Sequence, residues 1–190
     1  MIIPGRSLLT RIVRNVQAPK LQAQPCGVDL TLKRVLKWTS PGVIDLDNKF
    51  RQTASTEEIH FASEFLDLAY GSYLVEFNET VSVPVDVVGQ IFVRSSLFRS
   101  GVLIHAGVMD SGYEGAVGAL LQVVNPAGLR VYPSARLAQF VVHQMSEKVE
   151  GYKGTYQGTT SMGGRAEGVS SKIVHSQSMS KIGQGSMAEL

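Results

Sequence analysis

The sequence predicts an all-β protein, built as a sandwich, a jelly roll or a barrel, with one or two short helices. From Tyr73 onward, short apolar and β-branched runs follow one another, and glycine or proline separates them at short intervals. Several short strands with turn residues between them are typical of these folds. Hydrophobic residues make up 44% of the 190 residues, which is enough to bury a core, so global disorder is not expected.

The individual elements follow from local patterns. Residues 73–77 and 80–83 are read as two partner strands around a turn at Asn78-Glu79, and Pro84 would end the second strand. Four more β-rich runs are 87–93, 102–105, 116–124 and 137–143. Near the N-terminus, Ser7 precedes apolar residues with helical spacing and is a candidate helix cap. A second short helix is expected around residues 55–61.

Charge and cysteine content exclude several classes of protein. Lys and Arg total 18 against 16 Asp and Glu, a formal charge of +2, so no basic surface for nucleic acid is expected. The single cysteine, Cys26, excludes an internal disulfide and a multi-cysteine zinc site, and it is read as a small buried hydrophobe. No apolar run approaches the roughly 18 residues of a membrane helix, and the N-terminus lacks a signal-peptide core. A cytoplasmic protein that binds neither membrane nor nucleic acid is expected.

The composition changes near residue 150. Residues 1–150 are expected to form one β domain, and residues 151–190 a C-terminal arm and tail rich in Gly, Ser and Thr. Within the second part, residues 151–165 are read as a glycine-rich arm, and the remainder as a weakly structured tail.

The segment from His105 to Leu121 is the most informative for chemistry. Two strand-like runs flank a glycine-studded turn that holds Asp110, and Tyr113 follows three residues later. A hairpin of this kind can read a flat base edge with its backbone, because Gly107 and Gly118 allow close approach. A carboxylate at its mouth can orient and deprotonate a water. The alternative is that Asp110-Ser-Gly is only a hairpin turn.

Three other stretches carry polar residues in apolar surroundings. Ser95 and Ser96, flanked by arginines, form a candidate phosphate cradle, to which a helix starting near Ser95 would add N–H groups; a serine cap with solvated arginines is the alternative. Asp29 lies inside an apolar run and needs an arginine or a metal's hydration shell if it is buried. Arg136 and Gln139 interrupt another apolar run; for these runs the alternative is a strand end with an exposed polar group.

Together and in order, these stretches resemble the motifs of the trimeric dUTPase family, which is related to dCTP deaminase. Cys26-Gly-Val-Asp-Leu30 is similar to A-G-Y-D-L, and Arg94-Ser-Ser-Leu97 is similar to R-S-S/G-L. Ala106-Gly-Val-Met-Asp-Ser-Gly-Tyr-Glu-Gly-Ala-Val-Gly118 resembles A-G-V-I-D-x-x-Y-x-G-x-V-G, and Arg136-Leu-Ala-Gln139 resembles R-I-A-Q. The resemblance covers roughly residues 27–158.

This resemblance implies a distorted jelly-roll or β-barrel fold of the dUTPase kind, assembled as a homotrimer with each site built from several chains. It implies Mg²⁺-dependent hydrolysis of dUTP to dUMP and pyrophosphate. Asp110 would activate the attacking water, and Asp29 would reach Mg²⁺ through water. Arg136 would pair with an acidic residue near the site. The residues implied in substrate binding are Arg94, Ser95, Ser96, Gly107, Tyr113, Gly118, Gln139, Tyr156 and Gln157.

Two departures from the family pattern keep an alternative open. Instead of the usual fifth motif, R-G-x-x-G-F-G-S-T-G, residues 151–160 resemble the K-Y-Q-G-Q arm of dCTP deaminases, and Arg99 matches an arginine of that branch. A dCTP deaminase or a bifunctional enzyme is therefore the alternative. The deaminases carry a glutamate on the strand after the hairpin, where the nearest candidate here is Gln122, and a tryptophan in place of Tyr113. Because an amide is no general acid or base, the dUTPase branch is favoured, and the role of Glu114 stays open.

A third hypothesis belongs to another class: a non-catalytic nucleotide-binding regulator on the same fold. Asp110 and Tyr113 argue against it, because a protein that only binds nucleotide has no need of a carboxylate that activates water.

Overall fold

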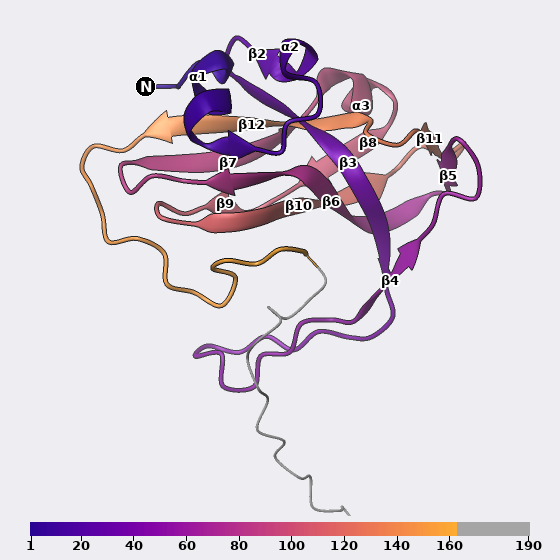
Figure 1. The fold of residues 1–190 in the computed structure, drawn as a ribbon. Coiled ribbons are helices and arrows are strands. Elements are labelled where there is room, and N and C mark those ends of the chain that lie inside the picture. The colour runs from indigo at the N-terminus through magenta and orange to yellow at the C-terminus, as the bar shows by residue number, and fades with distance from the viewer. Residues whose placement is uncertain (163–190) are drawn as a thin grey trace, which may run out of the picture.

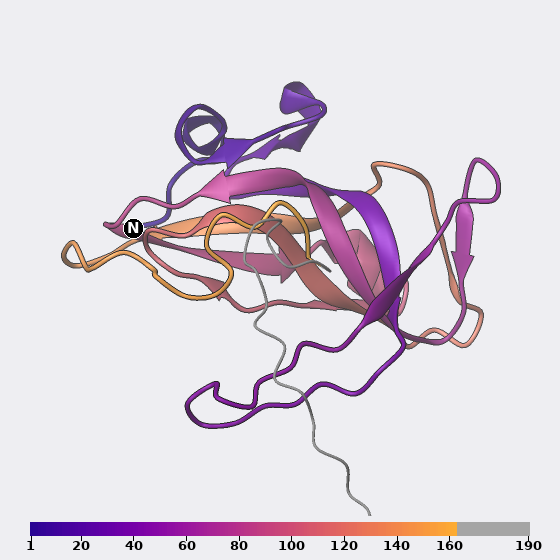
Figure 2. The same cartoon turned by 60° about the horizontal axis from the view of Figure 1, so that its bottom comes forward.

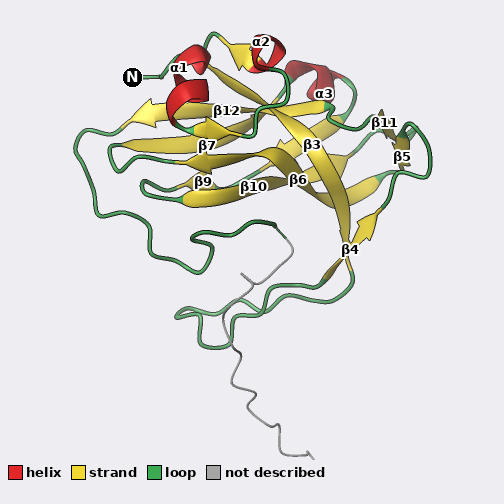
Figure 3. Ribbon diagram, viewed as in Figure 1, coloured by secondary structure: helices red, strands yellow, loops and turns green. Residues whose placement is uncertain are grey.

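The computed structural model describes residues 1–162, which form a curled antiparallel sheet with three short helices at one end (Figures 1 and 3). The helices are α1 (Gly5–Arg11), α2 (Pro19–Gln22) and α3 (Ser95–Arg99). The strands of the main sheet are β1 (Val13–Arg14), β2 (Ala23–Gln24), β3 (Gly27–Trp38), β4 (Thr56–Ile59), β6 (Gly71–Ser82), β7 (Val87–Val93), β8 (Val102–His105), β9 (Val108–Met109), β10 (Glu114–Val123) and β12 (Arg136–Gln144). A separate two-stranded sheet contains β5 (Leu66–Leu68) and β11 (Leu129–Val131).

The order of the strands requires the sheet to curl. The path runs β8-β10-β6-β3-β12-β7-β9, with β1 beside β6 and with β2 and β4 beside β3. Its two end strands are neighbours in the chain, since β8 ends at His105 and β9 begins at Val108. Such a short link brings the two edges of the sheet together, as in a barrel. The predicted all-β class is therefore confirmed. No helix within residues 1–162 is long and apolar enough to cross a membrane.

The core lies inside the curl and draws on the central strands. Leu30, Phe77 and Phe140 are among its largest fully buried side chains, and burying each one contributes roughly 1.5–3 kcal/mol. Gly89 on β7 leaves the space that the Phe140 ring fills, because a Cβ at Gly89 would lie 2.4 Å from that ring. Helices α1 and α2 pack against β3, so the start of this strand is buried on both faces, its polar residues included.

Two expected elements are wrong, and both errors concern the long strand pair β3–β6. Residues 55–61 hold strand β4 and no helix, because β3 extends far enough to offer these residues a pairing edge, with Val35 opposite Ile59. Asn78 and Glu79 form no turn, since β6 continues without a break from Gly71 to Ser82. The Asn78 amide instead donates to the Leu32 carbonyl across an irregularity in the β3–β6 register.

Two local expectations near the N-terminus are also wrong. Ser7 is no cap, because α1 already begins at Gly5 after Pro4, whose carbonyl accepts the Ser7 N–H. Cys26 is exposed, because it stands in the turn between β2 and β3 and its neighbour Gly27 takes the buried position. The expected start of a helix near Ser95 is confirmed by α3.

Two segments leave the sheet. The chain between β3 and β4 stands away from the body of the protein (Figures 1 and 2) and exposes Ile44, Leu46 and Phe50. After β12 the chain turns back beneath β9 and β10 (Figure 1); residues 151–162 are called the arm below. The tail expected after Arg165 lies outside the described residues.

Candidate functional site

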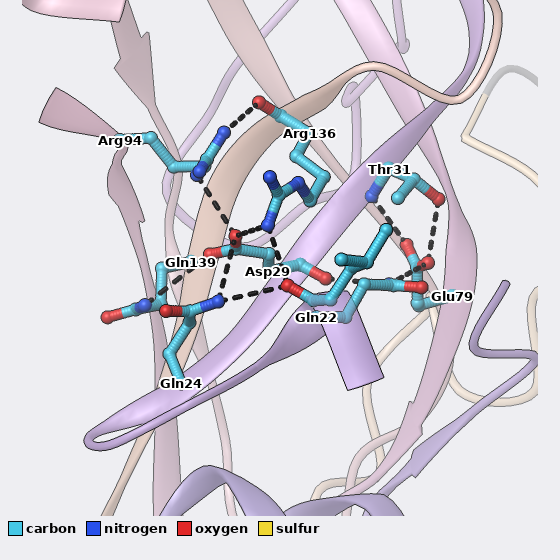
Figure 4. Close-up of polar contacts among 9 residues, drawn as sticks. Gln22, Gln24, Asp29, Thr31, Glu79, Arg94, Arg136 and Gln139 are labelled. Atoms are coloured by element: carbon cyan, nitrogen blue, oxygen red, sulfur yellow. Dashed lines mark hydrogen bonds and ion pairs between the residues drawn. The ribbon is translucent and has the colours of Figure 1, made fainter. Parts of the chain in front are cut away.

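Strand register brings the polar residues of three motifs together. On the neighbouring strands β7, β12 and β3, Gln139 lies directly opposite Asp29 on one side and Phe92 on the other. Arg94 follows β7, and its N–H donates to the Leu137 carbonyl of β12. Because all three strands meet at this level, residues distant in sequence form one group. We call Asp29, Arg94, Arg136 and Gln139 the arginine cluster (Figure 4).

Asp29 is the centre of the arginine cluster, and its side chain is only 1% exposed. Its Oδ2 atom lies 3.1 Å from Arg94 Nε and 3.2 Å from Arg136 Nη1. Weaker hydrogen bonds of 3.4 Å come from Gln24 to Oδ2 and from Gln139 to Oδ1. Burial raises the pKa of Asp29 above its ordinary value, and the charge of Arg94 is the largest effect opposing it. The two ion pairs favour the carboxylate form and partly offset the cost of burying its charge.

The two arginines of the cluster differ in their remaining hydrogen bonds. Arg136 Nη1 also donates to the Leu21 carbonyl at 2.6 Å, so this side chain ties α2 to the sheet. Arg94 donates through Nη1 to the Arg136 carbonyl, and among residues 1–162 its Nη2 has no hydrogen-bond partner. Ser95 and Ser96 begin α3 beside it, are exposed and cap no helix. Both N–H groups of Arg94 Nη2 and the hydroxyls of Ser95 and Ser96 are thus without a hydrogen-bond partner among residues 1–162.

A second buried network lies beside the arginine cluster, and it was not predicted from the sequence. Glu79 is fully buried and accepts hydrogen bonds from the Thr31 N–H at 2.8 Å, the Thr31 hydroxyl at 2.7 Å and the Gln22 amide at 2.7 Å. The Gln22 amide also donates to the Asp29 carbonyl. A signal was present: Glu79 falls on the same alternation as Val75, Phe77 and Val81, all of which are buried.

The segment from Gly107 to Gly118, called the Asp110 segment, runs from β9 at one end of the strand order to β10 near the other end. Asp110 is exposed, and its carbonyl accepts the Tyr113 N–H at 3.0 Å in a turn whose Gly112 has a φ of 82°. This is the geometry of a type II turn, which favours glycine at that position. The flanking strands are not partners as in the expected hairpin, because β9 pairs with β7, and β10 pairs with β6 and β8.

The two glycines expected to read a base have different surroundings. A Cβ at Gly107 would have no atom within 4 Å, so the backbone there faces open space. A Cβ at Gly118 would lie 2.5 Å from the Val75 carbonyl oxygen and 2.7 Å from Met162 Cγ. Gly118 is therefore required by close packing, and the arm residue Met162 lies directly on it.

The arm binds the Asp110 segment of its own chain. The Gln157 amide accepts from the Glu114 N–H at 3.1 Å and donates to the Gly112 carbonyl at 2.9 Å. Backbone hydrogen bonds of 2.8 Å join Gly158 to Glu114 and Ala116 to Thr159. These contacts occupy backbone groups of the turn that would otherwise face solvent.

Tyr113 of the turn is packed against the arm, whereas Tyr156 of the arm is exposed to solvent. The Tyr113 hydroxyl donates to the Ala116 carbonyl at 2.6 Å, and its ring meets that of Tyr152 edge to face at 5.7 Å. Burial raises the pKa of Tyr113 above its ordinary value, so this hydroxyl stays protonated. Tyr156 remains exposed, with the Arg51 guanidinium 5.3 Å from its ring centre.

The arginine cluster and the Asp110 segment are separated within one chain. Met109 pairs with Gly89 on β7, and Arg94 lies five residues beyond Gly89. At about 3.4 Å per residue, this places Arg94 about 17 Å further along the strand. The candidate phosphate residues and the candidate water-activating residue therefore do not face one common site in a single chain.

A metal bound only by protein is not provided for in the described part of the chain. Residues 1–162 contain no group of three or more His, Cys, Asp or Glu side chains able to hold a metal ion. Among residues 1–162, the long contact from Gln139 is the only hydrogen bond to Asp29 Oδ1. The donor set therefore fits an ion that takes most of its ligands from elsewhere.

Comparison with known proteins identifies the class to which this fold and site belong. Residues 3–145 match the family model described as dCTP deaminase-like. The chain belongs to this family, which confirms the resemblance found in the sequence motifs.

Individual relatives narrow the comparison. The deoxyuridine 5'-triphosphate nucleotidohydrolase of Methanocaldococcus jannaschii is 36% identical over 139 residues, which are 72% of this chain and 88% of the relative. The "Probable deoxyuridine 5'-triphosphate nucleotidohydrolase" of Aeropyrum pernix is 35% identical over 160 residues, 83% of this chain and 98% of the relative. The 2'-deoxycytidine 5'-triphosphate deaminase structure from Agrobacterium tumefaciens matches with a TM-score of 0.54 at 20% identity, over 74% of this chain and 46% of that one, and supports the fold alone.

Proposed function

We propose that this protein hydrolyses dUTP to dUMP and pyrophosphate. The observation that carries the proposal is the identity of 35–36% with the relatives from Aeropyrum pernix and Methanocaldococcus jannaschii, both named as hydrolases of this nucleotide. The chain covers 98% and 88% of their lengths, so the comparison spans nearly whole proteins. The exposed Asp110 and the partly free Arg94 give the reaction its chemical groups.

In this mechanism Asp110 is the general base. Its carboxylate takes a proton from a water, and the water oxygen forms a bond to the α-phosphorus while the bond to the bridging oxygen breaks. Pyrophosphate leaves with the additional negative charge. Arg94, Ser95, Ser96 and Gln139 donate hydrogen bonds to the phosphate oxygens, and donors fixed in advance stabilise charge as it develops.

Magnesium would assist at the arginine cluster. Mg²⁺ prefers phosphate oxygens and waters as ligands, and one or two nearby carboxylates suffice. When bound, it would neutralise phosphate charge. Asp29 would contact it through a bound water at Oδ1, because Oδ2 already pairs with Arg94 and Arg136.

We also propose a homotrimer in which each site combines two or more chains. Support comes from the separation of about 17 Å along the strand between Arg94 and the level of Met109, the neighbour of Asp110, estimated from strand spacing. A threefold assembly repeats one heterologous contact and closes it. The arm, with Tyr156 and Gln157, would cover the nucleotide and exclude water during turnover.

The alternative reaction, deamination of dCTP, lacks a suitable group on β10. Gln122 is an amide, and Glu114 is exposed and meets the arm through its backbone rather than through its carboxylate. A group that exchanges protons with water, the ring nitrogen and ammonia must be titratable. A nucleotide-binding regulator is the other alternative, and turnover of dUTP separates it from the enzyme.

A nucleotide panel tests the proposal directly. Purified protein with Mg²⁺ should release pyrophosphate from dUTP and little or no ammonia from dCTP, and EDTA should suppress the pyrophosphate signal. Pyrophosphate and ammonia are measured separately for dUTP, dCTP, dTTP and UTP. Ammonia from dCTP at a rate comparable to dUTP hydrolysis would establish the bifunctional alternative, and binding of dUTP without turnover would establish the regulator.

Tyr113→Ala should relax selection against the 2'-hydroxyl. We propose that the Tyr113 ring packs on deoxyribose and leaves no room for that group, which is selection by steric clash. The ratio of kcat/KM for dUTP over UTP should fall by about tenfold or more in the variant. Tyr132→Ala is the matched control, because Tyr132 is an exposed tyrosine beside β11. An equal ratio in the two variants would place Tyr113 outside the sugar pocket.

A further inference from the structure

Glu76 is a fully buried carboxylate that the mechanism above does not use. On β6, its Oε1 accepts from Lys33 Nζ at 2.6 Å, and its Oε2 accepts from Arg34 Nε at 2.9 Å and Nη2 at 2.7 Å. A fourth donor comes from the arm, whose Met162 N–H lies 3.0 Å from Oε2. The arm residue Met162 is therefore bound to a buried charge.

The position of Glu76 connects it to the candidate base site. Glu76 on β6 is paired with Gly118 on β10, so its side chain and the absent side chain of Gly118 point to the same face of the sheet. Met162 lies on that face, against Gly118, and donates its N–H to Glu76. Met162 therefore fills the position over Gly118, and the Glu76 carboxylate lies beside it.

The arm presents one carbonyl acceptor and one N–H donor to this region of the sheet. The Thr159 carbonyl accepts the Ala116 N–H, and the Met162 N–H is given to Glu76, while the Met162 side chain supplies apolar bulk over Gly118. Uracil carries both kinds of group on one flat ring, with the N3–H donor between two carbonyl acceptors. We propose that Glu76 accepts the N3–H of the pyrimidine in place of the Met162 N–H, and thereby selects uracil. This inference rests on the function proposed above.

The negative charge of Glu76 would make this site prefer uracil over cytosine. Burial alone would raise the pKa of Glu76, but hydrogen bonds from Lys33, the Met162 N–H and Arg34 outweigh it and lower the pKa below its ordinary value. The carboxylate is therefore an acceptor only. Cytosine carries a lone pair at N3, which would face a negative oxygen without a proton between them. A site built to accept a ring N–H rejects the analogue that lacks it.

Glu76→Gln separates this role from a purely structural one. The amide has the same shape but can also donate, so the ratio of kcat/KM for dUTP over dCTP, measured by pyrophosphate release, should fall by about tenfold or more. Lys33→Gln is the matched control, because it removes an ion pair from the same carboxylate and leaves the acceptor in place. Its ratio should stay near that of the wild type.

A modified nucleotide tests the same contact without altering the protein. Wild-type enzyme should hydrolyse 3-methyl-dUTP with a kcat/KM at least about tenfold below that for dUTP, because the N3–H is absent. Equal turnover of the two nucleotides would overturn the inference even where Glu76→Gln does not fold. So would an unchanged dUTP-to-dCTP ratio in Glu76→Gln, an equal fall in Lys33→Gln, or ammonia release from dCTP that Glu76→Gln abolishes. Absence of pyrophosphate from dUTP with the wild type would instead overturn the proposed function itself.

Discussion

Asp110→Asn is expected to lower kcat for dUTP by about 100-fold or more, the usual scale for losing a general base. The amide keeps the size of the side chain, and the turn does not depend on the carboxylate, because the Tyr113 N–H is accepted by the Asp110 main-chain carbonyl. Binding of a non-hydrolysable α,β-imido analogue of dUTP should therefore survive. Steady-state release of pyrophosphate and calorimetric titration with the analogue measure the two effects separately.

The matched control for this substitution is Asp47→Asn. Asp47 is also an exposed aspartate in a loop, but it lies between β3 and β4 and belongs to neither half of the candidate site. It should leave kcat within about twofold of the wild type, since surface substitutions away from special features rarely matter. Near-normal kcat in Asp110→Asn would remove Asp110 from the role of base.

Local sequence signals account for much of the fold and of the candidate site. The runs 87–93 and 102–105 coincide with β7 and β8, because short apolar segments bounded by turn residues have few alternative structures. A turn at Asp110 and a helix start at Ser95 were likewise readable from Asp-Ser-Gly and Arg-Ser-Ser. The need of a buried Asp29 for an arginine was a physical prediction, and Arg94 and Arg136 meet it.

The features of the fold and site that could not be predicted depend on contacts between residues distant in sequence. Asn78-Glu79 has the composition of a turn, but in β6 both side chains bond to β3, so tertiary pairing overrides the local preference. Glu76 is an ordinary strand glutamate in the sequence, and only the register places it opposite Gly118 and beneath Met162. The arm's return onto its own Asp110 segment follows from hydrogen bonds that no motif spacing encodes.

The separation of the arginine cluster from the Asp110 segment leads to a test of assembly. Arg94→Met keeps the apolar stem but removes the donors to phosphate, and it should lower kcat/KM by about 100-fold or more. Like Asp110→Asn, it should therefore be almost inactive alone. The two substitutions damage different halves of the proposed site. When the variants are combined, activity depends on whether the two halves of a site come from one chain or from two.

Mixed trimers of Asp110→Asn and Arg94→Met chains should recover activity that neither variant has. If a site takes its Asp110 segment from one chain and its arginine cluster from the next chain around the threefold axis, every trimer that contains both variants has one complete site among its three. Differently tagged chains are co-expressed, and doubly tagged protein is purified, weighed by light scattering and assayed for pyrophosphate release. Each variant co-expressed with itself is the control. If both halves come from the same chain, no mixed site is complete and activity stays at the sum of the two residual rates. That result, or a fully active wild-type monomer, would contradict the shared site, because a complete site can arise in the mixture only across a contact between chains.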